Sequence, residues 1–326
     1  MSIKNKTINT SVEDGQEYLS RCIEVNTSVE LDSVLDKTIH GDTFLVCPHL
    51  PRESIDLIIV DPPYNLSKKY GDTQFSEMDG ETYVSFTKRW LAQMCRLLKS
   101  NGSIYVCCDW KSSLVIGRLL GLLFEVRSRI TWGRDKGRGA SNNWKNNLED
   151  IWFATKSNTY TFNSDDVKMR RKVLAPYHDD LGSAKGWNEQ SGQKFRDTCP
   201  SNFWDDITIP FWSMPENTAH PTQKPEKLVA KLILASSNKN DVVFDPFLGS
   251  GTTSVVAKKL GRHYIGVEQE AQYCVWSEQR LELANIDKRI QGYEDGIFWE
   301  RNSRPSRTEI QSNLQVPSVQ RVHKFC

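Results

Sequence analysis

Residues 55–64, IDLIIVDPPY, join an apolar run to a short motif made of Asp61, Pro62, Pro63 and Tyr64. An unbroken apolar run of this length is typical of a strand that is buried on both faces of a parallel sheet. Ligands bind beyond the carboxyl ends of strands in such sheets, so the motif falls where chemistry is expected. The stretch therefore predicts a buried strand with a binding site at its end.

Strand and helix patterns alternate on both sides of this stretch. Helices are expected over 82–98, 111–123, 227–235, 252–260 and 271–284, and further strands over 103–108, 125–132, 150–155, 241–244 and 263–267. This alternation predicts an α/β fold with a doubly wound, mostly parallel sheet.

Three segments do not follow the alternation. The first 38 residues are polar and are interpreted as an N-terminal arm, and 287–326 as a polar, loosely packed C-terminal tail. Residues 161–218 mix cations, aromatic residues and glycines without clear periodicity, which indicates a separately folded insertion. The insertion divides one α/β domain into two halves, 39–160 and 219–286.

The composition excludes some classes of protein. Lys and Arg number 42 against 41 Asp and Glu, so no overall basic excess indicates nucleic acid, although charge can be concentrated in one cleft. The eight cysteines include no CxxC pair, which favours reduced thiols and no metal site. The N-terminus lacks the apolar core of a signal peptide, and the longest apolar stretch, 114–124, is too short to span a bilayer. We expect a soluble, cytoplasmic protein.

The motif at 61–64 suits a flat base that carries an exocyclic amine. The lone pair of an aromatic amine is delocalised into the ring and is a poor nucleophile. Hydrogen bonds from the amine to the Asp61 carboxylate and the Pro62 carbonyl favour a tetrahedral nitrogen with an available lone pair. Proline at 62 and 63 fixes this backbone, and Tyr64 would stack on a base that has left the duplex. A strand-ending turn with a capping aspartate is the structural alternative.

A second motif, DPFLGSGTT, begins at Asp245 where a predicted strand ends. Its glycine turn opens a helix, so backbone N–H groups meet a ligand there. The dinucleotide pattern GxGxxG is absent, and an acidic residue at the strand end suits an ammonium group better than a pyrophosphate. Glu268 ends the next strand and suits the hydroxyls of a ribose. Together they describe a pocket for S-adenosylmethionine.

These motifs and their order resemble the amino-group DNA methyltransferases of the beta arrangement, which methylate adenine N6 or cytosine N4. The matching segments are the Gly41-Asp42 pair, DPPYNL, FTKRWL with LLKSNGSIYV, EDIW at 149–152, HPTQKPEKL, DPFLGSGTT and RHYIGVE. The resemblance is strongest to the cell-cycle-regulated adenine methyltransferases and the methylases of restriction-modification systems. It implies a Rossmann-like methyltransferase fold in permuted motif order.

The resemblance also implies roles for single residues. Asp42 corresponds to a residue near the adenine of the cofactor, and Thr222 and Lys224 to residues near its carboxylate. A turn after Gly41 and a proline-bounded helix start are the structural alternatives. The remaining cofactor-binding residues implied by the motifs are Asp245, Phe247, Gly249, Ser250, Gly251, Thr252 and Glu268.

The insertion occupies the position of the target-recognition region in this family. Arg170, Arg171 and Lys172 are its candidate DNA-binding residues, because cations of this kind contact phosphates. The partners implied are double-stranded DNA, a restriction endonuclease that acts on the same site, and a second copy of the chain in a homodimer. The recognition sequence cannot be derived, because base readout has no code that transfers between proteins.

Three alternatives stay open at this point. The first is a cytosine-N4 methyltransferase, although those enzymes more often carry Ser at the position of Asp61. The second is a DNA-binding regulator that has lost catalysis, which the intact acidic residues disfavour. The third is a nicotinamide-dependent dehydrogenase, which the missing third glycine disfavours.

Overall fold

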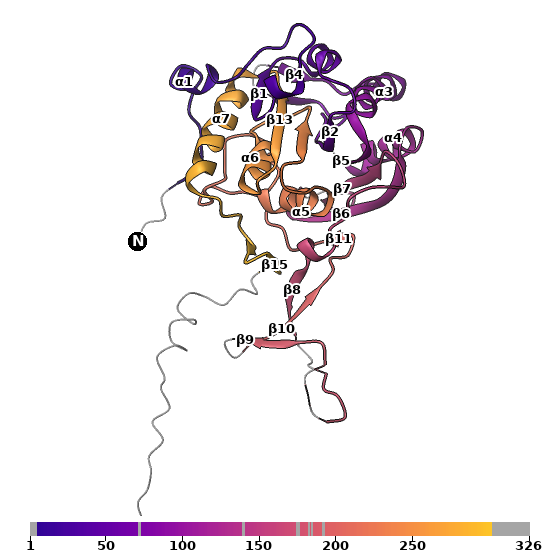
Figure 1. The fold of residues 1–326 in the computed structure, drawn as a ribbon. Coiled ribbons are helices and arrows are strands. Elements are labelled where there is room, and N and C mark those ends of the chain that lie inside the picture. Colours follow the sequence, from indigo (N-terminus) through magenta and orange to yellow (C-terminus); the bar gives the residue numbers. More distant parts are fainter. Residues whose placement is uncertain are drawn as a thin grey trace, which may run out of the picture.

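The computed structural model describes residues 5–301 apart from 71–72, 139–140, 174–176, 182, 184 and 191–192. An eight-stranded sheet forms its centre, in the order β1-β13-β12-β2-β5-β7-β6-β11 (Figure 1). In sequence order, these strands are β1 Lys37–His40, β2 Ile55–Val60, β5 Leu98–Cys108, β6 Glu125–Arg138, β7 Asn146–Thr155, β11 Phe203–Trp204, β12 Val242–Asp245 and β13 His263–Glu268. The helices are α1 Gln16–Leu19, α2 Thr43–Val46, α3 Gly80–Leu97, α4 Trp110–Leu120, α5 Glu226–Ser236, α6 Thr252–Lys259 and α7 Ala271–Ile286.

The sheet confirms the predicted fold class. Strands β1, β13, β12, β2 and β5 pair in parallel, while β7 is antiparallel to both β5 and β6. Strand β12 lies directly beside β2, with Phe244 opposite Ile58, although the two strands come from distant parts of the chain. The permuted halves thus meet at the centre of one sheet, and their carboxyl ends share one edge.

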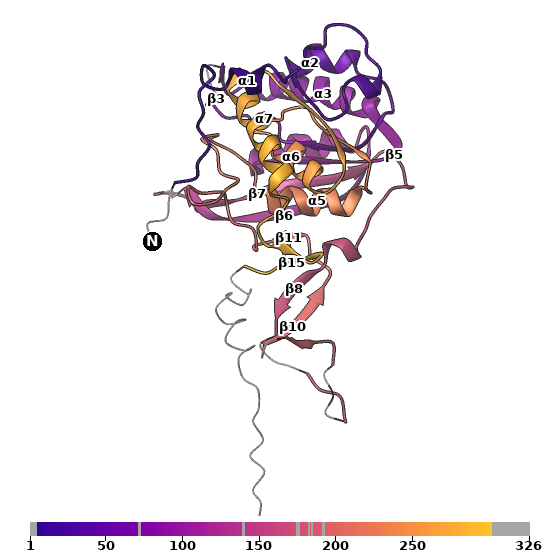
Figure 2. The ribbon, with the colours of Figure 1, turned by 60° about the vertical axis from the view of Figure 1, so that its left-hand side comes forward.

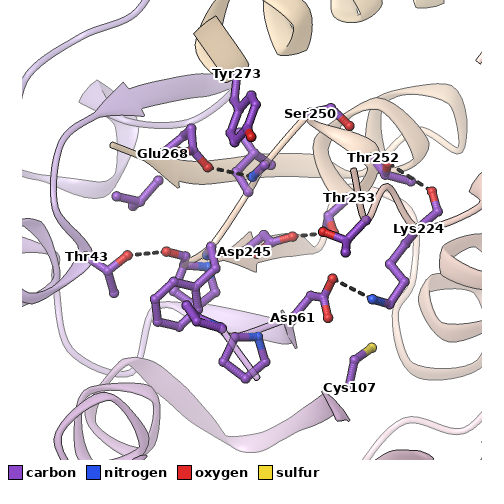
Figure 3. Close-up of a pocket in the computed structure, with 18 of the residues that line it drawn as sticks. Thr43, Asp61, Cys107, Lys224, Asp245, Ser250, Thr252, Thr253, Glu268 and Tyr273 are labelled. Carbon is purple, nitrogen blue, oxygen red and sulfur yellow. Dashed lines mark hydrogen bonds and ion pairs between the residues drawn. The ribbon is translucent and has the colours of Figure 1, made fainter. Parts of the chain in front are cut away.

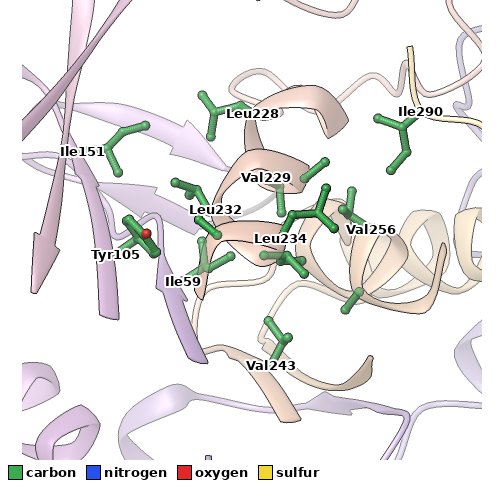
Figure 4. Packing of buried hydrophobic residues seen from close by; sticks show 14 of the residues in the cluster. Ile59, Tyr105, Ile151, Leu228, Val229, Leu232, Leu234, Val243, Val256 and Ile290 are labelled. Carbon is green, nitrogen blue, oxygen red and sulfur yellow. The ribbon is translucent and has the colours of Figure 1, made fainter. Parts of the chain in front are cut away.

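Both faces of the sheet are buried, which explains the unbroken apolar run of β2. Leu57 and Ile59 point to one face and pack in a cluster with residues of α5 and α6 such as Leu228 and Val256 (Figure 4). Ile58 and Val60 alternate to the other face, where helices α3 and α4 cover them. A strand between two helical layers has no solvent face and needs no polar residues.

A second, five-stranded sheet projects from this body (Figure 1, Figure 2). Its order is β14-β15-β8-β10-β9, formed by β8 Met169–Lys172, β9 Asn188–Gln190, β10 Gln193–Thr198, β14 Tyr293–Glu294 and β15 Ile297–Trp299. A short hairpin of β3 Lys68–Tyr70 and β4 Thr73–Phe75 completes the strands.

The structure corrects two predicted boundaries. Residues 287–301 are not a loose tail, because β15 pairs with β8 and Phe298 is fully buried. Residues 302–326 of the predicted tail lie outside the described residues. The insertion does not fold separately either: β11 pairs with β6 in the main sheet, and Ile207 is fully buried in the main core. Strands of two or three residues carry too little periodicity to be recognised in sequence.

The N-terminal residues also belong to the main body. Helix α1 packs against α7, and β1 begins at Lys37 as the edge strand beside β13, so the predicted boundary at 38 cuts through a strand. Residues 1–4 of the predicted arm lie outside the described residues. None of the helices that the structure describes is long and apolar enough to cross a membrane.

Candidate active site

A cavity of about 340 Å³ opens at the carboxyl edge of the main sheet, where β2, β12 and β13 end (Figure 3). Most of the residues expected from the sequence line it: Asp42, Asp61, Pro62, Pro63, Tyr64, Thr222, Lys224, Asp245, Phe247, Gly249, Ser250, Thr252 and Glu268. The edge collects them because adjacent parallel strands place their carboxyl ends side by side.

Gly251 is expected at this cavity but does not line it. It precedes α6 with a left-handed φ of 84°. A Cβ at this position would lie 2.3 Å from Ser277 Oγ, a side chain of α7. Glycine is therefore required at 251 by backbone conformation and by close packing, and not by contact with the cavity.

Asp61 follows the last residue of β2 and is held by two neighbours. Its Oδ2 accepts a hydrogen bond from Lys224 Nζ at 2.6 Å, and the Tyr64 hydroxyl lies 2.9 Å from its Oδ1. The Lys224 ammonium also lies 3.3 Å from Glu149 Oε2. One lysine thus stands between two carboxylates on the catalytic side of the cavity.

Burial and these neighbours set the protonation states. Burial raises the pKa of Asp61, and the Lys224 ammonium opposes that rise. Burial would lower the pKa of Lys224, but the Asp61 and Glu149 carboxylates outweigh it and raise that pKa above its usual value. Burial and the same two carboxylates raise the pKa of Tyr64 well above its usual range. Lys224 is therefore charged and Tyr64 is a neutral phenol at physiological pH.

Asp245 and Glu268 form the other side of the cavity. Asp245 accepts hydrogen bonds from Thr253 Oγ1 at 2.6 Å and from the Phe247 backbone at 3.0 Å. Glu268 accepts from the backbone N–H groups of Gly249 at 2.7 Å and Glu270 at 2.8 Å. Burial raises the pKa of each carboxyl to about 7, although these hydrogen bonds oppose the rise.

This side of the cavity fits the cofactor expected from the sequence. Within the described residues, neither Asp245 nor Glu268 has an ion pair with a basic side chain, so two buried carboxylates face the cavity without a cation. A buried carboxylate is costly unless it is paired. The ammonium of S-adenosylmethionine would supply that partner to Asp245, and its ribose hydroxyls would donate to Glu268.

The glycine turn shapes the same wall. Gly249 adopts a left-handed φ of 56°, and a Cβ at this position would lie 3.1 Å from His220 Nε2. The His220 ring in turn packs edge-on against Tyr273, with 4.4 Å between ring centres. Both side chains line the cavity, so a larger residue at 249 would displace its wall.

The structure shows further contacts of residues that were predicted to bind the cofactor. Lys224 lines the cavity as expected, and its ammonium contacts Asp61 and Glu149. Its contact with a cofactor carboxylate stays a prediction. Thr222 keeps its predicted position in the wall. Asp42 lines the cavity and also caps α2 by accepting from the Phe44 backbone at 2.6 Å, and its contact with the adenine of the cofactor stays a prediction.

Some residues at the site had no predicted role. Thr43 lines the cavity and donates a hydrogen bond to the Pro246 carbonyl, which joins α2 to the glycine turn. Glu149 stands at the catalytic side, although its motif EDIW carried no assignment. Its position as an acidic residue just before the apolar strand predicted at 150–155 is the only local signal that could have indicated it.

The candidate DNA-binding residues do not line the cavity. They belong to β8, in the small sheet that projects from the main body (Figure 2). Arg170 forms an ion pair with Asp197 at 2.7 Å, and its guanidinium lies 5.4 Å from the centre of the Trp299 ring. Arg171 is half-buried, and Lys172 is exposed. The three cations therefore differ, and Lys172 is the most accessible to a ligand.

Comparison with known proteins shows the family to which the chain belongs. A family model described as DNA methylase matches residues 55–279. Type II methyltransferase M.HpaI of Haemophilus parainfluenzae is 35% identical over 252 residues, which cover 74% of this chain and 74% of that protein. DNA adenine methyltransferase YhdJ of Escherichia coli K12 is 34% identical over 254 residues, with 76% of this chain and 83% of that protein covered. Type II methyltransferase M.HinfI of Haemophilus influenzae is 33% identical over 274 residues, covering 77% and 69%.

Solved structures share the architecture. The cytosine-N4-specific PvuII DNA methyltransferase superposes with a TM-score of 0.55 at 19% identity, covering 76% of this chain and 91% of that chain. A Thermus thermophilus protein described as a DNA modification methylase, in complex with S-adenosyl-L-methionine, gives 0.52 at 21% identity, covering 82% and 99%. At these identities the likeness shows the fold alone.

Proposed function

Because the chain belongs to the DNA methylase family that its residues 55–279 match, we propose that it transfers a methyl group from S-adenosylmethionine to N6 of adenine in double-stranded DNA. The observation that carries the proposal is the cavity itself. It holds Asp61 on one side and, on the other, the carboxylates of Asp245 and Glu268, which have no cationic partner among the described residues. Adenine is favoured as the target because YhdJ is named as an adenine methyltransferase.

The residues of the catalytic side act on the amine. When bound, S-adenosylmethionine supplies a methyl group on a positively charged sulfur. The Lys224 ammonium favours the charged form of Asp61, and the Asp61 oxygens have lone pairs that accept a hydrogen from the exocyclic amine. The Pro62 carbonyl accepts the second hydrogen, because a proline at 63 leaves no N–H nearby to compete for it. Tyr64 offers its ring to the base, while its hydroxyl lies against Asp61.

The proposal is tested by identifying the product. Purified protein is incubated with labelled S-adenosylmethionine and unmethylated plasmid, and the DNA is digested to nucleosides for mass spectrometry. We expect N6-methyladenine, and the Asp61→Ala protein serves as the blank. N4-methylcytosine would establish the cytosine alternative, and no labelled nucleoside would favour the inactive regulator. The dehydrogenase alternative is not proposed, because the chain is a DNA methylase by family.

We propose a restriction endonuclease with the same recognition sequence as a partner, since M.HpaI and M.HinfI are named Type II methyltransferases. DNA that the protein has methylated should resist that endonuclease. We propose that the protein acts in the cytoplasm. We also propose a homodimer. Sedimentation at micromolar concentration should give twice 37.4 kDa, and the single value would contradict a dimer.

A further inference from the structure

Glu149 lies near the amino end of β7, the antiparallel strand of the main sheet. Because β7 runs against β5, its first residues lie at the same edge as the carboxyl ends of the parallel strands. Only 7% of Glu149 is exposed. A buried carboxylate is thus placed beside Asp61 by the direction of one strand.

Both oxygens of Glu149 have partners. Its Oε2 lies 3.1 Å from the Tyr64 hydroxyl and 3.3 Å from Lys224 Nζ. Its Oε1 accepts from Arg134 Nη1 of β6 at 2.9 Å. Glu149 therefore contacts two of the side chains that hold Asp61, and Arg134 fixes it from the neighbouring strand.

These contacts divide the hydrogen-bond donors of Lys224 and Tyr64 between two carboxylates, Asp61 and Glu149. Lys224 Nζ lies 2.6 Å from Asp61 and also contacts Glu149, and the single hydroxyl hydrogen of Tyr64 can be donated to either carboxylate. With Glu149 present, neither donor is committed to Asp61 alone. Without it, the Tyr64 hydrogen and the Lys224 N–H that now face Glu149 would have Asp61 as their remaining carboxylate and would occupy lone pairs that the amine of a base requires.

We propose that Glu149 is a positioning residue for methyl transfer, which holds Lys224 and Tyr64 so that Asp61 keeps a lone pair for the reacting amine. The inference rests on the proposed function. Glu149 itself does not line the cavity and acts through its two neighbours.

The test compares Glu149→Gln with Asp150→Asn. Asp150 is the next residue on β7 and is also buried, but it accepts from Ser113 Oγ at 2.8 Å and Thr131 Oγ1 at 3.0 Å, away from Lys224. Glu149→Gln should lower kcat about 100-fold, the scale of a misplaced catalytic group, with KM for DNA and for S-adenosylmethionine unchanged. Asp150→Asn should lower the melting temperature and keep the wild-type kcat.

The pH profile separates positioning from folding. Asp61 is faced by Lys224, by Glu149, by Tyr64, by Cys107 of β5 and by Asp245 of β12. The negative charge of Glu149 raises the pKa of Asp61, so Glu149→Gln should move the acid limb of kcat/KM to lower pH. Glu149→Asp keeps the charge but withdraws the carboxylate, so kcat should fall while the acid limb stays in place.

Each outcome decides one question. A wild-type protein that methylates no DNA overturns the proposed function. An active wild type with unchanged kcat in Glu149→Gln and Glu149→Asp overturns this inference alone. Equal losses of kcat in Glu149→Gln and Asp150→Asn would assign Glu149 a structural role, which also overturns it.

Discussion

At the scale of single residues, burial and charge divide the cavity into two sides. On the catalytic side, Asp61 has a lysine partner at 2.6 Å, whose ammonium opposes the rise in the pKa of Asp61 that burial causes. On the other side, Asp245 and Glu268 accept only from hydroxyl and backbone donors among the described residues. The first side therefore offers a hydrogen-bond acceptor that suits a neutral amine, and the second offers carboxyl groups that suit a cationic ligand.

The first prediction concerns Asp61. Asp61→Ala should reduce methyl transfer by at least about 100-fold, because it removes an acceptor aimed at the reacting amine. Binding of S-adenosylmethionine, measured by calorimetry, should stay close to wild type, since Asp245 and Glu268 remain. Wild-type turnover in this variant would contradict the assigned mechanism.

The second prediction concerns pH. Burial raises the pKa of Asp245 and of Glu268 to about 7, so both are largely protonated at pH 6 in the free protein. Binding a cation to Asp245 requires the carboxylate, so the affinity for S-adenosylmethionine should fall by up to about tenfold per pH unit below 7 for each proton displaced. Calorimetry across this range measures the slope.

The sign for stability is opposite in the free protein. A carboxyl with a raised folded pKa favours folding below its unfolded pKa, and that contribution is lost as pH rises through about 7. The melting temperature of the free protein should fall as the pH rises from about 4 to about 7. Bound S-adenosylmethionine should offset this loss of stability. Asp245→Asn should bind the cofactor more weakly and show a flatter pH dependence in both measurements.

At the scale of elements, helix α5 joins the site to the projecting sheet. Lys224 precedes the helix. Lys227 and Lys231 lie within it, and both form ion pairs with the buried Asp206, with 2.7 Å between Lys231 Nζ and the Asp206 carboxylate. Lys227 also donates to the Trp299 carbonyl of β15 at 2.6 Å. The start of this helix therefore follows Lys224, and its side chains contact the end of the insertion and the C-terminal strand.

The third prediction tests whether β15 is part of the folded core. Phe298 is fully buried, and Phe298→Ala should lower the free energy of unfolding by about 3–5 kcal/mol. Urea denaturation measures the loss. Ile286→Ala, at a side chain 83% exposed, is the control and should change stability by less than about 0.5 kcal/mol. Equal stabilities would restore the interpretation of a loose tail.

The fourth prediction concerns DNA contact by β8. Lys172 is exposed, so Lys172→Ala should weaken DNA binding and lower the slope of log affinity against log salt by about one. Arg170→Ala should instead lower the stability of the small sheet, because Arg170 pairs with Asp197. Lys239→Ala is the matched control, since this exposed lysine precedes β12 at the edge of the main sheet opposite the cavity. An unchanged salt slope in Lys172→Ala would place the DNA elsewhere.

At the scale of the whole molecule, the insertion and the main domain are interleaved. The small sheet takes β8, β9 and β10 from the insertion and β14 and β15 from beyond α7. The end of the insertion returns to the main sheet as β11. A specificity region exchanged along the sequence boundaries would therefore break contacts on both sides.

The fifth prediction is a pair of chimeras. Replacing 161–202 together with 287–301 by the segments of a relative should keep the fold and move methylation to the relative's sequence. Replacing 161–218 alone removes Asp206 from Lys231 and separates β8 from its partner β15, so that chimera should melt at a lower temperature. Sequencing of methylated DNA reads the specificity. A stable first chimera with the original specificity would assign recognition to another region.

The sequence by itself determined the layers of the fold and the acidic residues of the cavity. The run at 55–60 is apolar because helices cover both faces of β2, so the composition of the run alone predicts its burial. Asp61, Asp245 and Glu268 could be predicted because each stands where an apolar strand ends, and parallel strands bring such ends together.

Only the tertiary structure decided which of these side chains pair. Glu149 reaches Lys224 because β7 runs antiparallel, and strand direction leaves no local pattern in the sequence. Phe298 is buried because the short strand β15 pairs with β8, a contact between distant segments. Periodicity reports how a residue meets the layer next to it, whereas pairing depends on register and direction across the whole sheet.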